Sequence, residues 1–244
     1  MLNTDLELVK KTAKLLLYTD FNLTDFSPIV IQHPFTSSGF AMVNKNGKAE
    51  LIDITANEEN AEEWRRAVNE QIKESKSAFE IYMMTNKPYG MTFLKFVAPY
   101  LSDGDFSQIL SDAWIRSENP NSDSNLSTED LVSMFELADK THLMSESEKR
   151  IFDELPAVLT IYRGVTPYNS DNVKALSWTL DKDVAEWFSK RFDEEGIVYK
   201  ANIHKNHVLA YFNGRNESEI IVDPKFLFHI TESEDQDESL NLSM

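Results

Sequence analysis

The hydrophobic pattern of the chain changes near Pro156, and this change constrains the fold more than any other feature of the sequence. Before Pro156, apolar residues recur mostly at spacings of three and four, which is typical of amphipathic helices. After it, short apolar runs between turn residues predict a series of strands. One predicted helix interrupts them, with an apolar stripe of Val184, Trp187, Phe188 and Phe192. We therefore expect an α+β protein whose C-terminal part is mainly β.

The helix-rich first part also contains one predicted β-hairpin, over residues 39–54. Asn46-Gly47 lies at its centre and supplies the two positive φ angles of a tight type I′ turn. Four helices are expected around the hairpin. The first covers 5–18, the second follows a Thr55/Glu58 capping box, the third runs from Pro88 to a break at Asp103-Gly104, and the fourth covers 106–115. Strands are expected at 28–31 and 79–84. Three tryptophans at helical spacing are expected in the core: Trp64, Trp114 and Trp187.

The polar run 117–125 is the clearest loop, and the elements that follow it define the rest of the chain. Capping-box spacings at Ser127/Asp130 and Ser145/Glu148 predict helices over about 128–139 and 146–154. The predicted strands are 158–163, 174–177, 197–203, 207–212, 218–222 and 226–231. We therefore divide the chain into an N-terminal α+β region (1–116), a helical linker packed on the core (117–155), a mainly β core (156–231) and an acidic tail (232–244) that we expect to be frayed.

Composition excludes several classes of function. The chain has no cysteine, which removes disulfides, thiolate metal sites and cysteine nucleophiles. Its net charge is −17, and both halves are acidic: residues 1–150 contain 15 basic and 24 acidic residues, and residues 151–244 contain nine basic and 17 acidic residues. Nucleic-acid binding is not expected without clustered cations. We also expect no metal site and no membrane association, and a cytoplasmic location in a bacterium or in a bacterial host.

Three short segments of the β-rich part carry residues suited to chemistry. Arg163 closes a predicted strand and can contact a phosphate with its planar fork of donors, while Gly164 permits a turn and the close approach of a ligand. Ser177 can orient a carboxylate on a neighbouring strand. Glu217 and Glu219 are two residues apart, so in a strand they would lie side by side, and their repulsion would raise one pKa. Together these groups suit an anionic, sugar-containing ligand whose glycosidic bond is broken.

The same segments resemble the R-S-E class of ADP-ribosyltransferases. The resemblance rests on the strand Ile161-Tyr162-Arg163-Gly164, on Ser177-Trp178-Thr179 leading into a helix, and on Glu217-Ser218-Glu219 followed by aliphatic residues. It is greatest to the bacterial-toxin and phage-encoded branch and covers about residues 156–231. The implied fold is a C-terminal split β-sandwich, and the implied reaction transfers ADP-ribose from NAD⁺ to a side chain of a target protein, first of all arginine.

The resemblance assigns a role to each residue. Arg163 would contact the NAD⁺ phosphate or ribose, and Ser177 would position Glu219. Glu219 would hold the nicotinamide ribose and stabilise the oxocarbenium-like transition state, and Glu217 would deprotonate the acceptor. The other expected NAD⁺-binding residues are Gly164, Thr179, Trp178, Phe188 and Arg191, with Trp187 and Phe192 as further candidates for an aromatic wall.

Trp178 departs from the pattern, since the family commonly has Thr there, and it can face either the core or the nicotinamide. Two other functions stay open. The site can hydrolyse NAD⁺ when water replaces the acceptor, or the motif can belong to a binding or virion protein without activity. The oligomeric state and the role of residues 1–115 are not predicted.

Overall fold

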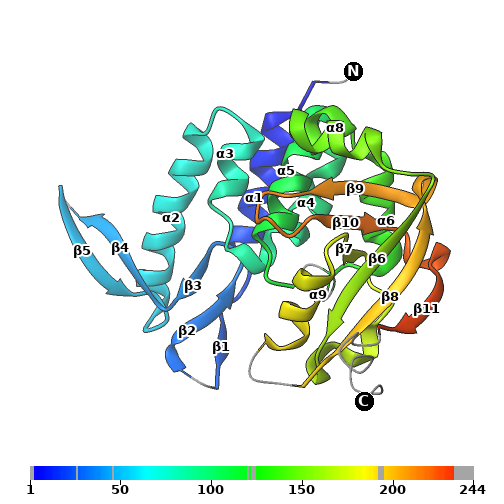
Figure 1. Ribbon diagram of the computed structural model, residues 1–244. Coiled ribbons are helices and arrows are strands. Elements are labelled where there is room, and N and C mark those ends of the chain that lie inside the picture. Colours follow the sequence, from blue (N-terminus) through cyan, green and yellow to red (C-terminus); the bar gives the residue numbers. More distant parts are fainter. Residues whose placement is uncertain are drawn as a thin grey trace, which may run out of the picture. The chain divides into compact units, whose positions relative to one another are not determined.

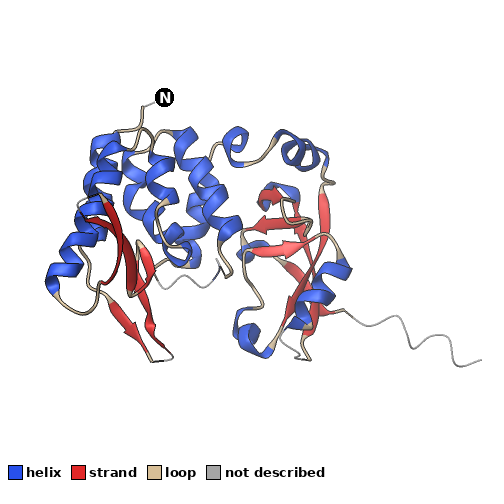
Figure 2. Cartoon of the chain, turned by 90° about the vertical axis from the view of Figure 1, so that its left-hand side faces the viewer, coloured by secondary structure: helices blue, strands red, loops and turns tan. Residues whose placement is uncertain are grey.

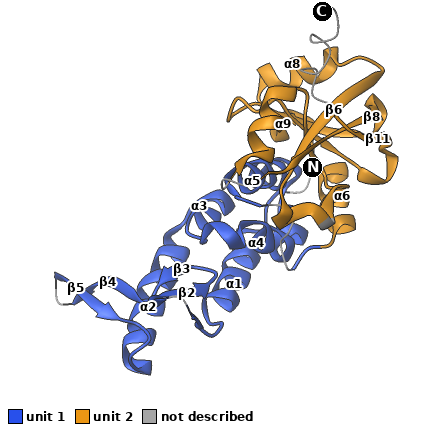
Figure 3. Cartoon of the chain, turned by 60° about the horizontal axis from the view of Figure 1, so that its bottom comes forward, with its two compact units in different colours: residues 1–126 blue, residues 127–244 orange. Residues whose placement is uncertain are grey.

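A computed structural model describes residues 3–25, 27–45, 47–119, 121, 125–191 and 195–233, with the side chain of Asp171 excepted. The chain forms two compact units, Met1–Leu126 and Ser127–Met244 (Figure 3). The division falls inside the predicted linker, so that residues 127–155 belong to the same unit as the strand-rich part. Within the described residues, no helix is long and apolar enough to cross a membrane.

The first unit is built from helices and short antiparallel strands (Figure 1). Its main elements are α1 (Leu6–Leu17), β1 (Asn22–Thr24), β2 (Ser27–His33), β3 (Thr36–Ser38), β4 (Phe40–Lys45), β5 (Lys48–Asp53), α2 (Glu58–Glu74), α3 (Ala78–Met83), α4 (Gly90–Val97) and α5 (Asp103–Arg116). The predicted hairpin is confirmed as β4–β5, in which Lys45 pairs with Lys48 and Gly47 has φ +82°. Asn46, the other predicted turn residue, lies outside the described residues.

Three local predictions in this unit were wrong, each because another cap or spacing governs the segment. The predicted strand 79–84 is helix α3, which is capped by Ser77 and buries Ala78, Ile81 and Tyr82 at helical spacing. Helix α2 begins after Asn57, whose side chain accepts from the Asn60 amide, and not at a Thr55/Glu58 box. Asp103-Gly104 begins α5 after the cap Ser102 and does not end a helix.

The second unit contains a six-stranded antiparallel sheet of order β11-β8-β6-β7-β10-β9, which Figure 2 shows in red with helices around it. Its strands are β6 (Val158–Val165), β7 (Ser177–Thr179), β8 (Ile197–His204), β9 (Val208–Phe212), β10 (Glu219–Val222) and β11 (Phe228–Glu232). The sheet is weakest at its centre, where a single registered pair, Tyr162 with Thr179, joins β6 to β7. The predicted strand 174–177 lies further along the chain, since β7 begins at Ser177.

Both capping boxes that the sequence predicts after residue 126 are present. Ser127 with Asp130 begins α6 (Thr128–Leu137), and Ser145 with Glu148 begins α8 (Glu146–Glu154). Helix α7 (Lys140–Leu143) lies between them. Helices α6 and α8 pack against β9, so the predicted packing of this helical segment on the core is observed. The acidic tail from residue 234 lies outside the described residues.

Helix α9 (Lys182–Ser189) packs against β6 through small residues, which corrects the predicted aromatic stripe. It buries Ala185 and Ser189 above Gly164, where an added Cβ would meet the Ala185 carbonyl oxygen at 2.1 Å. Trp187 is 60% exposed, so the prediction that it belongs to the core was wrong. Trp64 and Trp114 are buried as predicted. Phe192 lies outside the described residues.

Candidate active site

The centre of the candidate site is a hydrogen bond between neighbouring strands. Ser177 Oγ donates to Glu219 Oε1 over 2.5 Å. Strands β7 and β10 pair so that Ser177 lies opposite Ile221, which puts Glu219 diagonally across from Ser177 on the same face. Glu219 is 5% exposed although it is ionisable. A carboxylate this deeply buried needs such a donor, and the bond fixes its orientation.

Arg163 of β6 connects to the same strand through its guanidinium group. Its Nη1 donates to the carbonyl oxygen of Ser177 over 2.7 Å. Burial lowers the pKa of Arg163 to about 10, while the carboxylate of Glu219 opposes this shift. The side chain therefore stays charged at neutral pH. Its buried Nε has no hydrogen-bond partner among the described residues, which leaves a cationic donor for an anionic group.

Glu217 reaches the site from a turn and not from a strand, which corrects the reasoning that placed it beside Glu219. Strand β10 begins at Glu219, and Asn216 and Ser218 on either side of Glu217 have φ of 57° and 44°. Such left-handed angles are uncommon outside glycine and indicate a turn held by its surroundings. The Asn213 side chain accepts from the Ser218 amide, and the Thr179 hydroxyl donates to the Glu217 carbonyl oxygen.

The two glutamates share a cation that sequence reasoning missed. Arg215 Nη2 lies 3.0 Å from Glu217 Oε2 and 3.9 Å from Glu219 Oε2. The side chain of Arg215 is 40% exposed, whereas those of Glu217 and Glu219 are 21% and 7% exposed. Arg215 therefore offsets the repulsion expected between the carboxylates. The only sequence signal for it is the spacing Arg-x-Glu-x-Glu, which has no structural meaning until the turn brings the three side chains together.

The other residues predicted to bind a cofactor occupy different positions. Trp178 is 2% exposed and donates its Nε1–H to the Ala175 carbonyl oxygen, so of the two orientations left open it takes the core. Thr179 is buried and its hydroxyl is used by the Glu217 turn and by the Asp181 amide. Gly164 lies within β6 and faces α9 rather than an open space. Each of these three residues has a role in packing or in the Glu217 turn, and their contact with NAD⁺ stays a prediction.

Phe188 and Arg191 form a small cluster with the exposed Trp187. The Arg191 guanidinium carbon lies 5.3 Å from the Trp187 ring centroid and 5.4 Å from that of Phe188. The two rings are 4.9 Å apart in an edge-to-face arrangement. The guanidinium group is therefore attracted to both rings, which stabilises the cluster.

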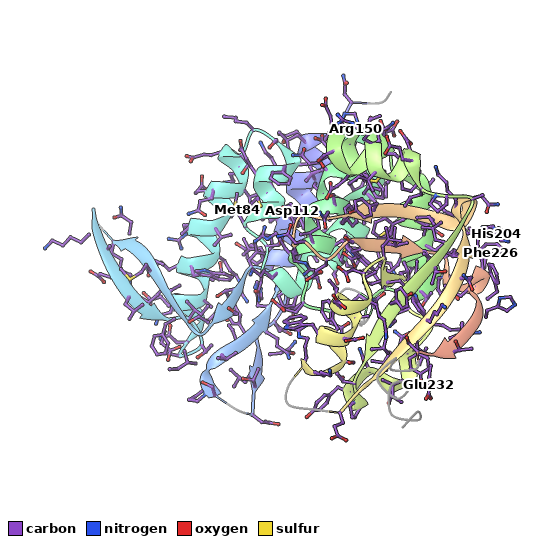
Figure 4. All side chains as sticks on the ribbon, viewed as in Figure 1. Met84, Asp112, Arg150, His204, Phe226 and Glu232 are labelled. Carbon is purple, nitrogen blue, oxygen red and sulfur yellow. The ribbon has the colours of Figure 1, made fainter. Side chains whose placement is uncertain are left out.

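Two histidines of the second unit, His204 and His207, stack on aromatic rings. His204 stacks on Phe228 with ring centroids 5.2 Å apart, and His207 stacks on Phe226 at 3.5 Å. Figure 4 labels His204, the last residue of β8, and Phe226, which precedes β11 in the chain. The described residues contain no group of three or more His, Asp or Glu side chains that could hold a metal ion.

Chemically, the site combines a buried, oriented carboxylate with a second carboxylate and a buried cation. Glu219 can accept from a sugar hydroxyl and stabilise a neighbouring positive charge, because it is buried and Ser177 holds it in place. Glu217 is more exposed and can take a proton from an incoming nucleophile. Comparison with protein-family models, with curated proteins and with solved structures found no match to this chain.

Proposed function

We propose that the second unit is a mono-ADP-ribosyltransferase that moves ADP-ribose from NAD⁺ to a protein side chain, with arginine as the first candidate acceptor. The observation that carries the proposal is the hydrogen bond from Ser177 to the buried Glu219, with Arg163 bonded to the same strand. It joins the three residues of the sequence motif in one place. These residues are 14 and 42 positions apart along the chain, and the pairing of β6, β7 and β10 brings them together.

The fold supports this proposal at a coarse level. The strand pairs described in the second unit are all antiparallel, and one registered pair joins β6 to β7 at the centre of the sheet. A split at that junction would yield two three-stranded groups, β11-β8-β6 and β7-β10-β9, and division of the sheet into two parts is compatible with a split β-sandwich.

The residues present fit NAD⁺ by their chemistry. Arg163 has a buried Nε without a partner among the described residues, and it is the group that would hold a phosphate or ribose oxygen. Glu219 would accept from the nicotinamide ribose and stabilise the positive charge that develops when the glycosidic bond breaks. Glu217 would accept the proton of the acceptor. Phe188 and Arg191 remain proposed neighbours of the nicotinamide and a phosphate.

The test is incubation of the purified protein with NAD⁺ labelled in the adenosine part, in the presence of bacterial lysate. Label should enter protein with the wild-type chain and should fall by at least about 100-fold with Glu219→Gln, because this change removes the charge that stabilises the transition state. Glu232→Gln is the matched control, since Glu232 is an exposed glutamate of β11 in the same unit.

The result also separates the alternatives. Nicotinamide release without labelled protein would identify an NAD⁺ glycohydrolase with the same site. Neither label nor nicotinamide release, together with no NAD⁺ binding in calorimetry, would refute the enzyme and leave a binding protein that carries the motif.

A further inference from the structure

Arg215 places a guanidinium group where an arginine acceptor would have to react. Its Nη2 lies 3.0 Å from the oxygen of Glu217, the residue that would deprotonate the acceptor, and 3.9 Å from the oxygen of Glu219. Glu219 would hold the ribose whose C1′ atom is attacked. A nucleophile must contact its base and lie within about 3.5 Å of the reacting carbon, and a group between the two carboxylates can satisfy both conditions.

The backbone keeps Arg215 in this position. The Asn216 amide donates to the Asn213 carbonyl oxygen at 2.9 Å, and the Asn213 amide donates to Glu148 of the α8 capping box at 2.7 Å. The turn is fixed on its other side by the Thr179 hydroxyl. Arg215 therefore extends from an anchored turn, and its side chain retains 40% exposure, so that a transferred group has room.

We propose that Arg215 is a self-modification site, at which the chain transfers ADP-ribose to its own arginine in cis. This inference rests on the proposed function and adds a specific acceptor atom. It also explains the Arg-x-Glu-x-Glu spacing, because Arg215 forms an ion pair with Glu217, the base that would activate it.

The reaction balances with NAD⁺ as its one co-substrate. The bond between C1′ and the nicotinamide nitrogen breaks, and nicotinamide leaves as a neutral base with the bonding electron pair. Arg215 Nη2 gives a proton to Glu217, and the lone pair so freed forms the new bond to C1′. The product carries the two phosphates of ADP-ribose on the Arg215 side chain, beside the glutamates.

The experiment is mass spectrometry of peptides from the full chain after incubation with NAD⁺. Arg215 should be modified in nearly every chain, with a first-order rate that does not change over a 100-fold dilution. Glu217→Gln should lower this rate by at least about 100-fold, as loss of a general base does. Arg150, an exposed arginine of α8 labelled in Figure 4, is the internal control and should remain unmodified.

A mixture of chains separates reaction in cis from reaction between molecules. Isotopically heavy Glu219→Gln chain is incubated with light wild-type chain and NAD⁺. Modification in cis labels the light Arg215 peptide alone, whereas ADP-ribose on the heavy peptide would overturn the proposal.

Failure of this inference is distinguishable from failure of the function. If Glu219-dependent nicotinamide release or labelling of another protein occurs while Arg215 stays unmodified, the cis acceptor is refuted and the transferase or hydrolase stands. If no NAD⁺ is consumed, both are refuted.

Discussion

Gly164→Ala tests whether the glycine of the Tyr-Arg-Gly motif is required by packing or by a ligand. In the structure an added Cβ would lie 2.1 Å from the Ala185 carbonyl oxygen, 2.5 Å from the Ser189 amide nitrogen and 2.8 Å from Phe188 Cβ. The shortest of these falls about 0.9 Å short of 3.0 Å, below which real Cβ atoms are essentially never found. Two of the three atoms belong to the backbone of α9, so no side-chain rotation relieves the clash.

Strand β6 and helix α9 must therefore separate. Overpacking costs about 1–3 kcal/mol, and we expect the upper end, about 3 kcal/mol, because backbone must move. For a unit of this size, that lowers the melting temperature by roughly 10 °C or more. Calorimetry of the full chain measures the shift, and hydrogen exchange of the β6 amides assigns it to the second unit.

Gly214→Ala is the matched control, because an added Cβ there meets nothing within 4 Å. Its free energy of unfolding should stay the same or rise by up to about 1 kcal/mol, through the lower entropy of the unfolded chain. A Gly164→Ala chain that melts within a degree of the wild type but no longer binds NAD⁺ would refute the packing argument and favour a ligand role for this glycine.

Three further predictions concern individual side chains. Ser177→Ala removes the donor to buried Glu219, so it should lower the free energy of unfolding by about 1.5–3 kcal/mol, measured by denaturant titration. It should also reduce kcat for NAD⁺ cleavage more than it changes KM in steady-state kinetics, and a wild-type kcat would contradict the role given to this hydrogen bond. Trp178→Ala should lower the free energy of unfolding by about 3–5 kcal/mol in the same titration, whereas Trp187→Ala should lower it by less than about 0.5 kcal/mol. Equal decreases for the two variants would contradict the exposure of Trp187. Burial lowers the pKa of His33 to about 4, so the unfolded chain takes up a proton at this residue more readily than the folded chain. The first unit should therefore lose up to about 3 kcal/mol of its free energy of unfolding as the pH falls from 6.5 to 4. His33→Gln should flatten this pH dependence when unfolding is measured at a series of pH values.

Local chemistry explains which parts of the fold the sequence predicts. The hairpin over 39–54 and the boxes at Ser127/Asp130 and Ser145/Glu148 depend on residues within four positions of one another, so their geometry is written in the chain. The strands of the second unit follow from short apolar runs in the same way. Helix α3 could also have been predicted, because Ser77 and Glu80 have the spacing of a helix cap. The mainly apolar segment 79–84 favoured a strand instead.

Long-range packing decided the rest. The sequence predicts Arg163, Ser177 and Glu219 as site residues, but only the pairing of β6, β7 and β10 brings them together. Trp187 is exposed because the backbone of β6 at Gly164 packs closely against the small residues Ala185 and Ser189 of α9. Gly164 therefore decides which face of α9 is buried, although it lies more than 20 positions away from Ala185 in the sequence.

Arg215 shows the same limit within a short segment. Its distance from Glu217 and Glu219 depends on left-handed angles at Asn216 and Ser218, which few residues adopt unaided. Those angles persist because the turn is bonded to β7 and to α8, elements that precede it by more than 30 residues. The candidate residues and most of their local structure can therefore be predicted from the sequence. Their partners depend on the tertiary structure, because hydrogen bonds and burial join positions that local propensity cannot connect.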